Sequence, residues 1–224
     1  MSIHAPSHVT PTLVADQVYE ILENGILTGR LAAGSPLRVQ ELAAMVGTSV
    51  MPVREAIRRL EEAGLATRIP HKGAVVKTFT VAELIHIYDV RTTLEVDATR
   101  KGTPNVTASD IQHMKTMLGH MQKAAGEDRI ADALDLDEEI LRTLYKASGN
   151  PVLVSVIDTL WLQCRPFKAI GVTEALDNHD ITPWTPQPAL FEAVKAGDTV
   201  TAAAITADSL ASARRRLVLR LEPH

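Results

Sequence analysis

Four basic side chains between residues 38 and 72 have the chemistry to bind nucleic acid. Arg38, Arg54 and Arg58 lie in or beside two predicted short helices, and Lys72 follows in a predicted turn. A guanidinium group forms paired hydrogen bonds with a phosphate or with the edge of guanine, whereas an ammonium binds phosphate as a point charge. We therefore expect this region to recognise double-stranded DNA.

Two short helices around a tight turn would position these side chains. Gly47 can adopt the positive φ that a sharp reversal needs, Ser49 can cap the second helix, and Pro52 suits its first turn. The second helix would bury a stripe at i, i+3, i+4 and i+7, formed by Val53, Ala56, Ile57 and Leu60. This spacing indicates a helix-turn-helix, but an ordinary helical hairpin in a larger bundle would also show it.

A β-hairpin is predicted directly after this pair of helices. Residues 65–78 contain two short β-prone runs around Pro70 to Gly73. Directly behind a recognition helix, such a hairpin would be a wing, and its tip would present His71, Lys72 and Gly73 to phosphates or to a narrow minor groove. A plain surface hairpin is the alternative.

From Thr80 onward every predicted segment is helical. Thr80 and Glu83 have the spacing of a capping box, and Thr107 can cap the next helix. A Pro-rich loop is expected over 171–188, and helices over about 80–102, 107–126, 128–148, 151–164, 189–196 and 198–222. Such helices form a bundle that can enclose a cavity.

The expected fold is therefore mostly α. A flexible tail (1–11) would precede an N-terminal winged helix-turn-helix with a small β-hairpin (12–79). A C-terminal all-α antiparallel helical bundle (80–224) would follow.

Composition limits the possible compartments and partners. The chain has 224 residues, one cysteine and a formal net charge of −4. No apolar run is long enough for a membrane span, and a single cysteine suits a reducing compartment, so we expect a cytoplasmic location and no membrane partner. Through Phe79 the chain has eight Lys/Arg against seven Asp/Glu, a net charge of only +1, so dimerisation would have to multiply the DNA affinity of each subunit.

The chain resembles the GntR family of bacterial transcription regulators, in its FadR-like subfamily. The most specific motif runs from Pro52 to Leu65, and three further motifs lie at 88–95, 144–151 and 191–198. The resemblance implies a homodimer that binds a pseudo-palindromic operator. It also assigns residues 80–224 to dimerisation and to binding a small metabolite that changes the DNA affinity.

The DNA contacts implied by this resemblance and by the residue spacing come from Arg38, Ser49, Met51, Arg54, Arg58, Lys72 and Gly73. Arg54 ranks first because it lies near the helix N-terminus, where the major groove is entered. Arg58 has an alternative partner in Glu62 at i, i+4. Arg59 is expected to be a solvated surface residue. Val50 stands where the family usually has Arg, which removes one charged DNA contact.

The effector domain departs from the family in its metal site. Many members bind a divalent metal through one Asp and three His. Asp137 is retained here, but Leu141, Gln187 and Ser209 stand at the histidine positions. We therefore expect no metal and no other cofactor. A substitute site built from His113, His120 and His179 is the minority alternative.

A polar floor for a metabolite is expected from Arg91, Asp137, Gln187 and Ser209, with Arg165 in the pocket wall. Arg91 would either bind a carboxylate ligand directly or form a buried ion pair with Asp137. The effector would be an organic acid or an acyl-CoA-like molecule. An effector-blind DNA-binding or architectural protein is the alternative.

Enzymatic activity is not expected. Cys164 lies within a predicted helix without a nearby His, and the sequence has neither a Gly-rich phosphate loop nor a Gly-x-Ser-x-Gly elbow.

Overall fold

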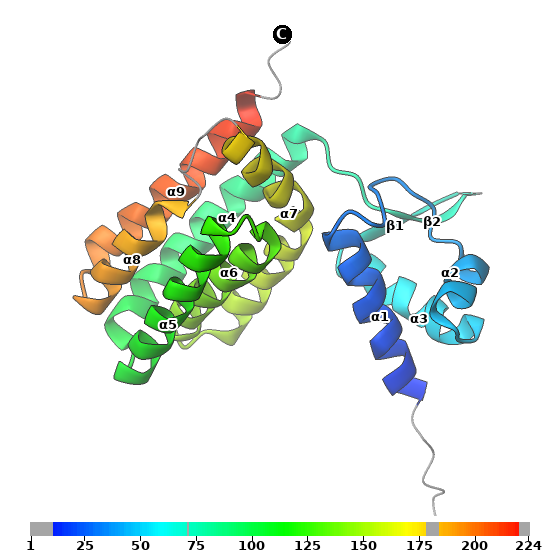
Figure 1. Cartoon of the computed structure of the whole chain (residues 1–224), viewed down its shortest axis with the longest axis horizontal. Coiled ribbons are helices and arrows are strands. Elements are labelled where there is room, and N and C mark those ends of the chain that lie inside the picture. Colours follow the sequence, from blue (N-terminus) through cyan, green and yellow to red (C-terminus); the bar gives the residue numbers. More distant parts are fainter. Residues whose placement is uncertain (1–10, 71, 178–183, 220–224) are drawn as a thin grey trace, which may run out of the picture. The chain divides into compact units, whose positions relative to one another are not determined.

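The computed structural model describes residues 11–70, 72–177 and 184–219. The chain divides into two compact units between Thr78 and Phe79 (Figure 1). The first contains α1 (Pro11–Leu27), α2 (Val39–Val46), α3 (Val50–Glu62), β1 (Ala66–Ile69) and β2 (Gly73–Val76). The second contains α4 (Val81–Gly102), the 3-10 turn η1 (Thr103–Asn105), α5 (Ala108–Gly126), α6 (Ile130–Lys146), α7 (Pro151–Asp177), α8 (Pro186–Lys195) and α9 (Thr199–Leu219).

The predicted helix-turn-helix is confirmed as α2, a turn at Gly47, and α3. Gly47 has φ 71°, and its N–H donates to the carbonyl of Ala43, which closes α2. The stripe predicted for α3 is buried, with Val53, Ala56, Ile57 and Leu60 each 3% exposed or less. Burial of a Val, Ile or Leu side chain stabilises by about 1.5–3 kcal/mol, so this stripe fixes which face of α3 points outward.

The predicted hairpin is confirmed as β1 and β2. The strands are antiparallel and in register from Ala66 opposite Val76 to Ile69 opposite Gly73. The segment before α2 joins the same sheet, because the N–H of Leu37 donates to the carbonyl of Ala74 at 2.8 Å. The hairpin is thus hydrogen-bonded to the chain that leads into α2. His71 lies outside the described residues.

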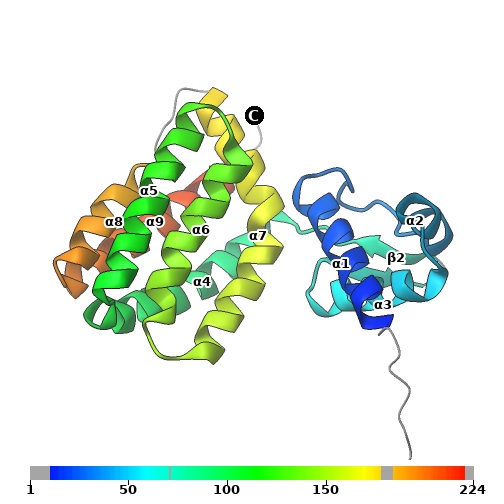
Figure 2. The same cartoon turned by 60° about the horizontal axis from the view of Figure 1, so that its bottom comes forward.

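The second unit is a helical bundle in which α4 contacts α6, α7 and α9, while α5 lies along α6 and α8 along α9 (Figure 2). The predicted capping box of Thr80 and Glu83 is present, and the predicted cap Thr107 forms a second capping box with Asp110. The largest fully buried side chains of the bundle include Tyr145, Met114, Met121, Ile140 and Leu144. No helix in the described part of the chain is long and apolar enough to cross a membrane.

Several predicted boundaries need correction. The helix expected to end near Cys164 continues through Pro166 to Asp177, so the predicted loop does not begin at Gly171. Pro166 removes one backbone hydrogen bond, but packing holds the helix on both sides of it: Cys164 and Val172 are buried. α8 begins at Pro186 rather than at Ala189. The expected tail lies outside the described residues except for Pro11, and so does the expected end of the last helix near Glu222.

Candidate functional site

The outward face of α3 presents both charged and apolar side chains. Arg54 is exposed, and no ion pair joins it to another described residue. At the helix start Met51 is 68% exposed and Val50 39% exposed. Ser49 occupies the N-cap position with extended backbone, but its side chain makes no capping hydrogen bond. The first-turn N–H groups and the Ser49 hydroxyl are therefore available to an anion such as phosphate.

Two of the other predicted contacts are engaged in exposed ion pairs. Arg38 donates to Glu41 at 2.8 Å, and the exposed fractions of the two side chains are 66% and 67%. Arg58 donates to Glu55 at 2.5 Å and also pairs with Glu62, the alternative that the i, i+4 spacing raised. Surface pairs of this kind contribute only about 0–1 kcal/mol, so a phosphate can displace the carboxylates.

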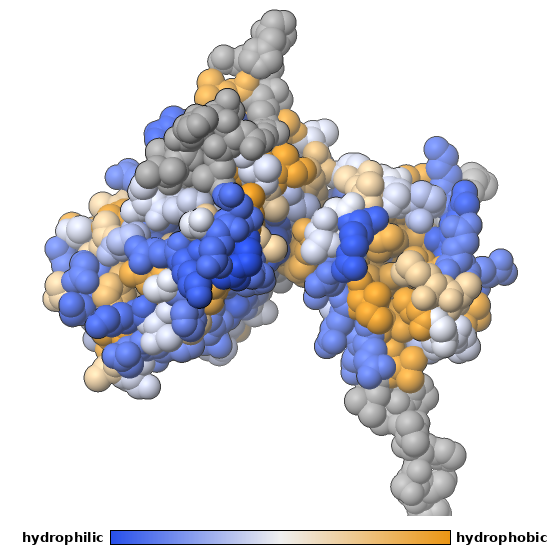
Figure 3. Space-filling model, in the orientation of Figure 1, coloured by the Kyte–Doolittle hydropathy of each residue, from blue (hydrophilic) through white to orange (hydrophobic). Residues whose placement is uncertain are grey.

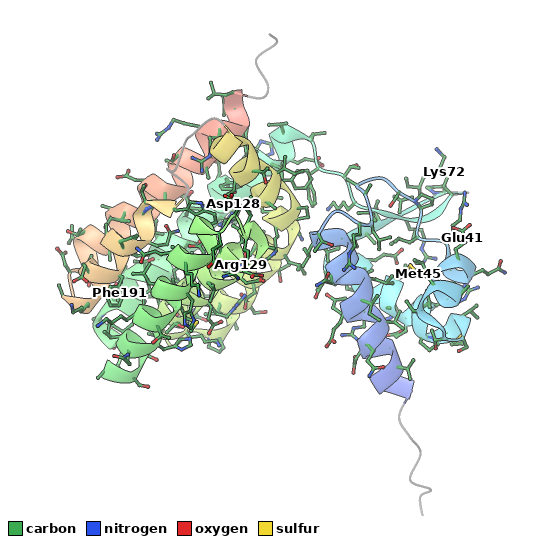
Figure 4. The ribbon with its side chains drawn as sticks, viewed as in Figure 1. Glu41, Met45, Lys72, Asp128, Arg129 and Phe191 are labelled. Atoms are coloured by element: carbon green, nitrogen blue, oxygen red, sulfur yellow. The ribbon has the colours of Figure 1, made fainter. Side chains whose placement is uncertain are left out.

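The hairpin tip and α2 complete this surface. Lys72 projects from the tip, and Glu41 and Met45 project from α2 (Figure 4). Lys72 and Gly73 are both exposed, and nothing lies within 4 Å of where a Cβ on Gly73 would be. Space-filling colours show apolar surface among hydrophilic residues on the visible face of this unit (Figure 3). The first unit thus combines unpaired cations with exposed apolar side chains.

Arg59 does not have the solvated position expected for it. Its side chain is 33% exposed, pairs with Asp16 of α1 and lies over the ring of Tyr19, with the guanidinium carbon 4.4 Å from the ring centroid. The prediction was wrong because α1 packs against this flank of α3. Arg59 therefore holds α1 to α3.

The second unit encloses a cavity of about 780 Å³, here called the bundle cavity, within the size range of small-molecule sites. Its lining comes from helices α4, α6, α7, α8 and α9 and from Trp184 and Thr185, which directly precede α8. Of the five predicted ligand residues, four line it: Arg91, Asp137, Gln187 and Ser209. Arg165 is not in the lining.

Arg91 pairs with Glu95 one turn along α4, and not with Asp137. The Arg91 Nε to Glu95 Oε1 distance is 2.7 Å, and both side chains are buried. Glu95 also accepts hydrogen bonds from Trp161 Nε1 and the Tyr145 hydroxyl, each at 3.0 Å. Burial acts to lower the pKa of Arg91, but the Glu95 charge outweighs it and holds that pKa well above its ordinary value.

Asp137 binds two other side chains of the lining. Lys168 Nζ donates to Asp137 Oδ2 at 2.7 Å, and Gln187 Nε2 donates to Asp137 Oδ1 at 2.6 Å. Burial opposes the charge on Lys168, but the Asp137 and Glu138 carboxylates raise its pKa above the ordinary value. Lys168 therefore stays charged at neutral pH.

These residues do not fit the divalent metal that the resemblance implies. An ammonium already occupies one Asp137 oxygen, and Gln187 turns its N–H, which cannot coordinate a metal, toward the other. In the described part of the chain no group of three or more His, Cys, Asp and Glu side chains is placed to hold a metal ion. His113 contacts Glu139 at 3.2 Å, whereas His179 lies outside the described residues.

Arg165 connects α7 to α6 instead of forming the pocket wall. It donates to Glu138 at 2.7 Å and pairs with Asp135. The expectation failed because the face of α7 that carries Arg165 meets the acidic residues of α6. Burial raises the pKa of Glu138, and the nearby Lys168 and Arg165 charges oppose that rise.

Two polar atoms of the lining are left without partners. Gln187 Oε1 and Trp184 Nε1 are buried and make no hydrogen bond. Sequence reasoning assigned no role to Trp184, Glu95 or Lys168. The i, i+4 spacing of Arg91 and Glu95 was readable and could have identified that pair, but nothing local pointed to Lys168 or Trp184.

Known proteins match both units. A family model described as "Bacterial regulatory proteins, gntR family" matches residues 14–76, and an FCD domain model matches residues 86–212. The Escherichia coli HTH-type transcriptional regulator McbR is 28% identical over 159 residues, 71% of each chain. A probable D-xylose utilization operon transcriptional repressor from Paenarthrobacter nicotinovorans is 29% identical, over 85% of this chain and 82% of its own.

Solved structures show the same fold. The structure of E. coli McbR/YncC superposes with a TM-score of 0.79 at 22% identity and covers 93% of this chain and 99% of its own. A putative GntR regulator from Rhodococcus sp. RHA1 gives a TM-score of 0.78 at 19% identity, covering 91% and 97%. With the helix-turn-helix, the hairpin and the helical bundle all in place, the chain belongs to the GntR family of bacterial transcriptional regulators with an FCD domain, and not to a family of enzymes.

Proposed function

We propose that this regulator binds a specific operator through α3 and the β1–β2 hairpin, and that a small metabolite in the bundle cavity changes its DNA affinity. In this proposal the protein works as a cytoplasmic homodimer and uses no metal ion. Binding of the metabolite releases the operator.

The observation that carries the DNA assignment is the state of Arg54. It is exposed on α3 beside the buried stripe, and no described carboxylate pairs with it. A helix that enters the major groove contacts base edges with residues of its first turns, where Arg54 lies. Arg38, Ser49, Arg58, Lys72 and Gly73 would contact the phosphate backbone around it.

Met51 and Val50 add an apolar contact. Both are exposed at the start of α3. Apolar side chains in the major groove pack against the C5-methyl group of thymine. We therefore expect operator half-sites that place thymine beside the start of the helix.

Dimerisation is supported by the small charge of the DNA-binding unit. A net charge of +1 through Phe79 gives one subunit little electrostatic affinity for DNA. Two linked subunits on two half-sites convert the second contact into an intramolecular event, which multiplies the affinity. A pseudo-palindromic operator follows from the two-fold symmetry of such a dimer.

Repression is supported by the relative from P. nicotinovorans, whose name describes a probable operon repressor. The effector role of the cavity is supported by its volume of about 780 Å³ and by two buried polar atoms in its lining without partners. An effector-blind regulator is the second candidate.

Selection of bound sequences from random double-stranded DNA with the full-length chain tests the DNA proposal. A pseudo-palindromic site is expected. Arg54→Ala should weaken binding to that site about tenfold and relax the sequence preference at the base pair that Arg54 contacts. Arg100→Ala, an exposed arginine of α4 in the second unit, removes the same charge and should change neither the affinity nor the preference.

Unchanged operator binding by Arg54→Ala would refute the assignment of α3. For the effector, operator-bound protein is titrated with extracts of small metabolites. Release by some fraction supports a ligand-responsive regulator, whereas complete insensitivity favours the effector-blind candidate.

A further inference from the structure

We infer that the effector is a small, uncharged, polyhydroxylated molecule, of the sugar or polyol class, whose hydroxyl groups bind Gln187, Trp184 and Lys168. This inference rests on the proposed function, because it names the ligand class of the bundle cavity. It follows from the hydrogen-bond donor or acceptor that each of these three side chains still needs.

Gln187 requires a hydrogen-bond donor from the ligand. Its amide orientation is fixed, because Asp137 Oδ1 only accepts and so must face the Nε2 hydrogens, at 2.6 Å. Gln187 Oε1 is thereby directed elsewhere, and it is buried without a partner. A carboxylate ligand without a hydroxyl offers no hydrogen to this oxygen at neutral pH.

Trp184 and Lys168 require acceptors. The indole N–H of Trp184 is buried without a partner. Lys168 carries three N–H groups, of which one donates to Asp137. An ammonium ligand would satisfy Gln187 but would have nothing to accept these hydrogens. A hydroxyl both donates and accepts, so neighbouring hydroxyl groups satisfy all three side chains.

The charges of the lining favour an uncharged ligand. Among the described residues of the lining, Arg91, Lys168 and Arg216 balance Glu95, Asp137 and Asp208, so their formal charges sum to zero. The buried Arg91 and the partly buried Lys168 are matched locally, since Arg91 pairs with Glu95 and Lys168 with Asp137. A ligand carboxylate would give up its hydration without meeting an uncompensated positive charge. The carboxylate effector that Arg91 suggested in the sequence is therefore disfavoured.

Thermal unfolding and calorimetric titration of the full-length protein test the ligand class. The probes are neutral sugars and polyols from xylose to sorbitol, gluconate as the polyhydroxylated acid, and adipate as a dicarboxylate without hydroxyl groups. At least one neutral probe should raise the melting temperature and bind more tightly than gluconate, and adipate should not bind. Tighter binding of adipate or gluconate, or no binding by any neutral probe, would overturn the inference.

A pair of matched variants assigns the contact. Trp184→Phe keeps an aromatic side chain but removes the five-membered ring with its N–H, so it should weaken binding of the neutral probe about tenfold. Trp161→Phe makes the same chemical change at an indole that donates to Glu95, and should leave the affinity unchanged. Equal affinities for Trp184→Phe and the unmodified protein would show that water, and not the ligand, satisfies the indole.

Operator binding, measured on the same samples, separates this inference from the proposed function. If adipate binds and releases the operator, the regulator stands and the sugar or polyol class falls. If the protein does not bind a selected operator at all, the proposed function itself fails, whatever the cavity binds.

Discussion

Lys168 Nζ lies 2.7 Å from Asp137 Oδ2, so an ammonium from α7 neutralises the one carboxylate that the family resemblance assigned to a metal site. The other Asp137 oxygen accepts from Gln187. Asp137 is thus retained in a structural role, as the acceptor that orients two residues of the cavity lining.

Removal of Lys168 should cost much more stability than removal of an exposed lysine. Lys168→Met leaves Asp137, 3% exposed, without its counter-charge. We expect the free energy of unfolding at pH 7 to fall by about 3 kcal/mol, at the low end for a buried pair because Lys168 is 24% exposed. Urea titration followed by circular dichroism measures the loss.

Lys101→Met is the matched control for that experiment. Lys101 also pairs with an aspartate, Asp97, at 2.6 Å, but the side chains are 53% and 46% exposed. Its removal should cost less than about 1 kcal/mol. Similar losses for the two variants would contradict the role assigned to Lys168.

The protein should contain no bound metal. Lys168 occupies the carboxylate that would serve as a ligand, and an amide and a hydroxyl replace two of the three imidazoles. Elemental analysis of protein purified without a metal-affinity tag should find zinc, nickel and manganese far below one equivalent, and EDTA should not change the melting temperature. Stoichiometric metal, or a clear shift with EDTA, would show that another donor set binds it.

Local patterns predicted the framework because they depend on near neighbours. The buried stripe of α3, the capping box at Thr80 and the N-cap at Thr107 each lie within a few turns of helix and were predicted correctly. The common location of the cavity residues was also predicted correctly, because the sequence placed Arg91, Asp137, Gln187 and Ser209 in one polar floor and all four line the cavity. The pairing partners of the long side chains were harder to predict.

The side-chain partners that were not predicted depend on how two packed helices are rotated relative to each other. Arg165 and Lys168 have partners on α6, far away in sequence, and no local pattern specifies which face of α7 meets α6. Pro166 compounded the error, because a helix that ended before it would have removed Lys168 from the bundle. The ion pair of Arg91 with Glu95 could have been predicted, since Glu95 lies one helical turn away in the sequence.

Glu138 should make the folded state less stable as pH rises. Its folded-state pKa is raised by burial above the ordinary 4.5, so its protonated form favours folding. That contribution is fully present below about pH 4.5 and disappears as pH rises through the folded-state pKa. Glu138→Gln lacks the titration.

The measurement is the difference in unfolding free energy between the unmodified protein and Glu138→Gln from pH 4 to pH 8. The difference should move in favour of the variant as pH rises, and then become constant. A difference that instead moves in favour of the unmodified protein would mean that the Arg165 ion pair, at 2.7 Å, outweighs burial.

Restoring an arginine at position 50 should strengthen DNA binding. Val50 is 39% exposed at the start of α3, where the family usually carries Arg. Val50→Arg adds one phosphate contact, so the log–log salt slope of operator binding should steepen by about one and the affinity at low salt should rise.

Val200→Arg is the matched control, because Val200 is an exposed valine in the first turn of α9, in the second unit. It adds the same charge outside the DNA-binding unit and should leave the slope unchanged. Equal slopes for both variants would show that position 50 does not face the DNA, and the orientation proposed for α3 would have to be abandoned.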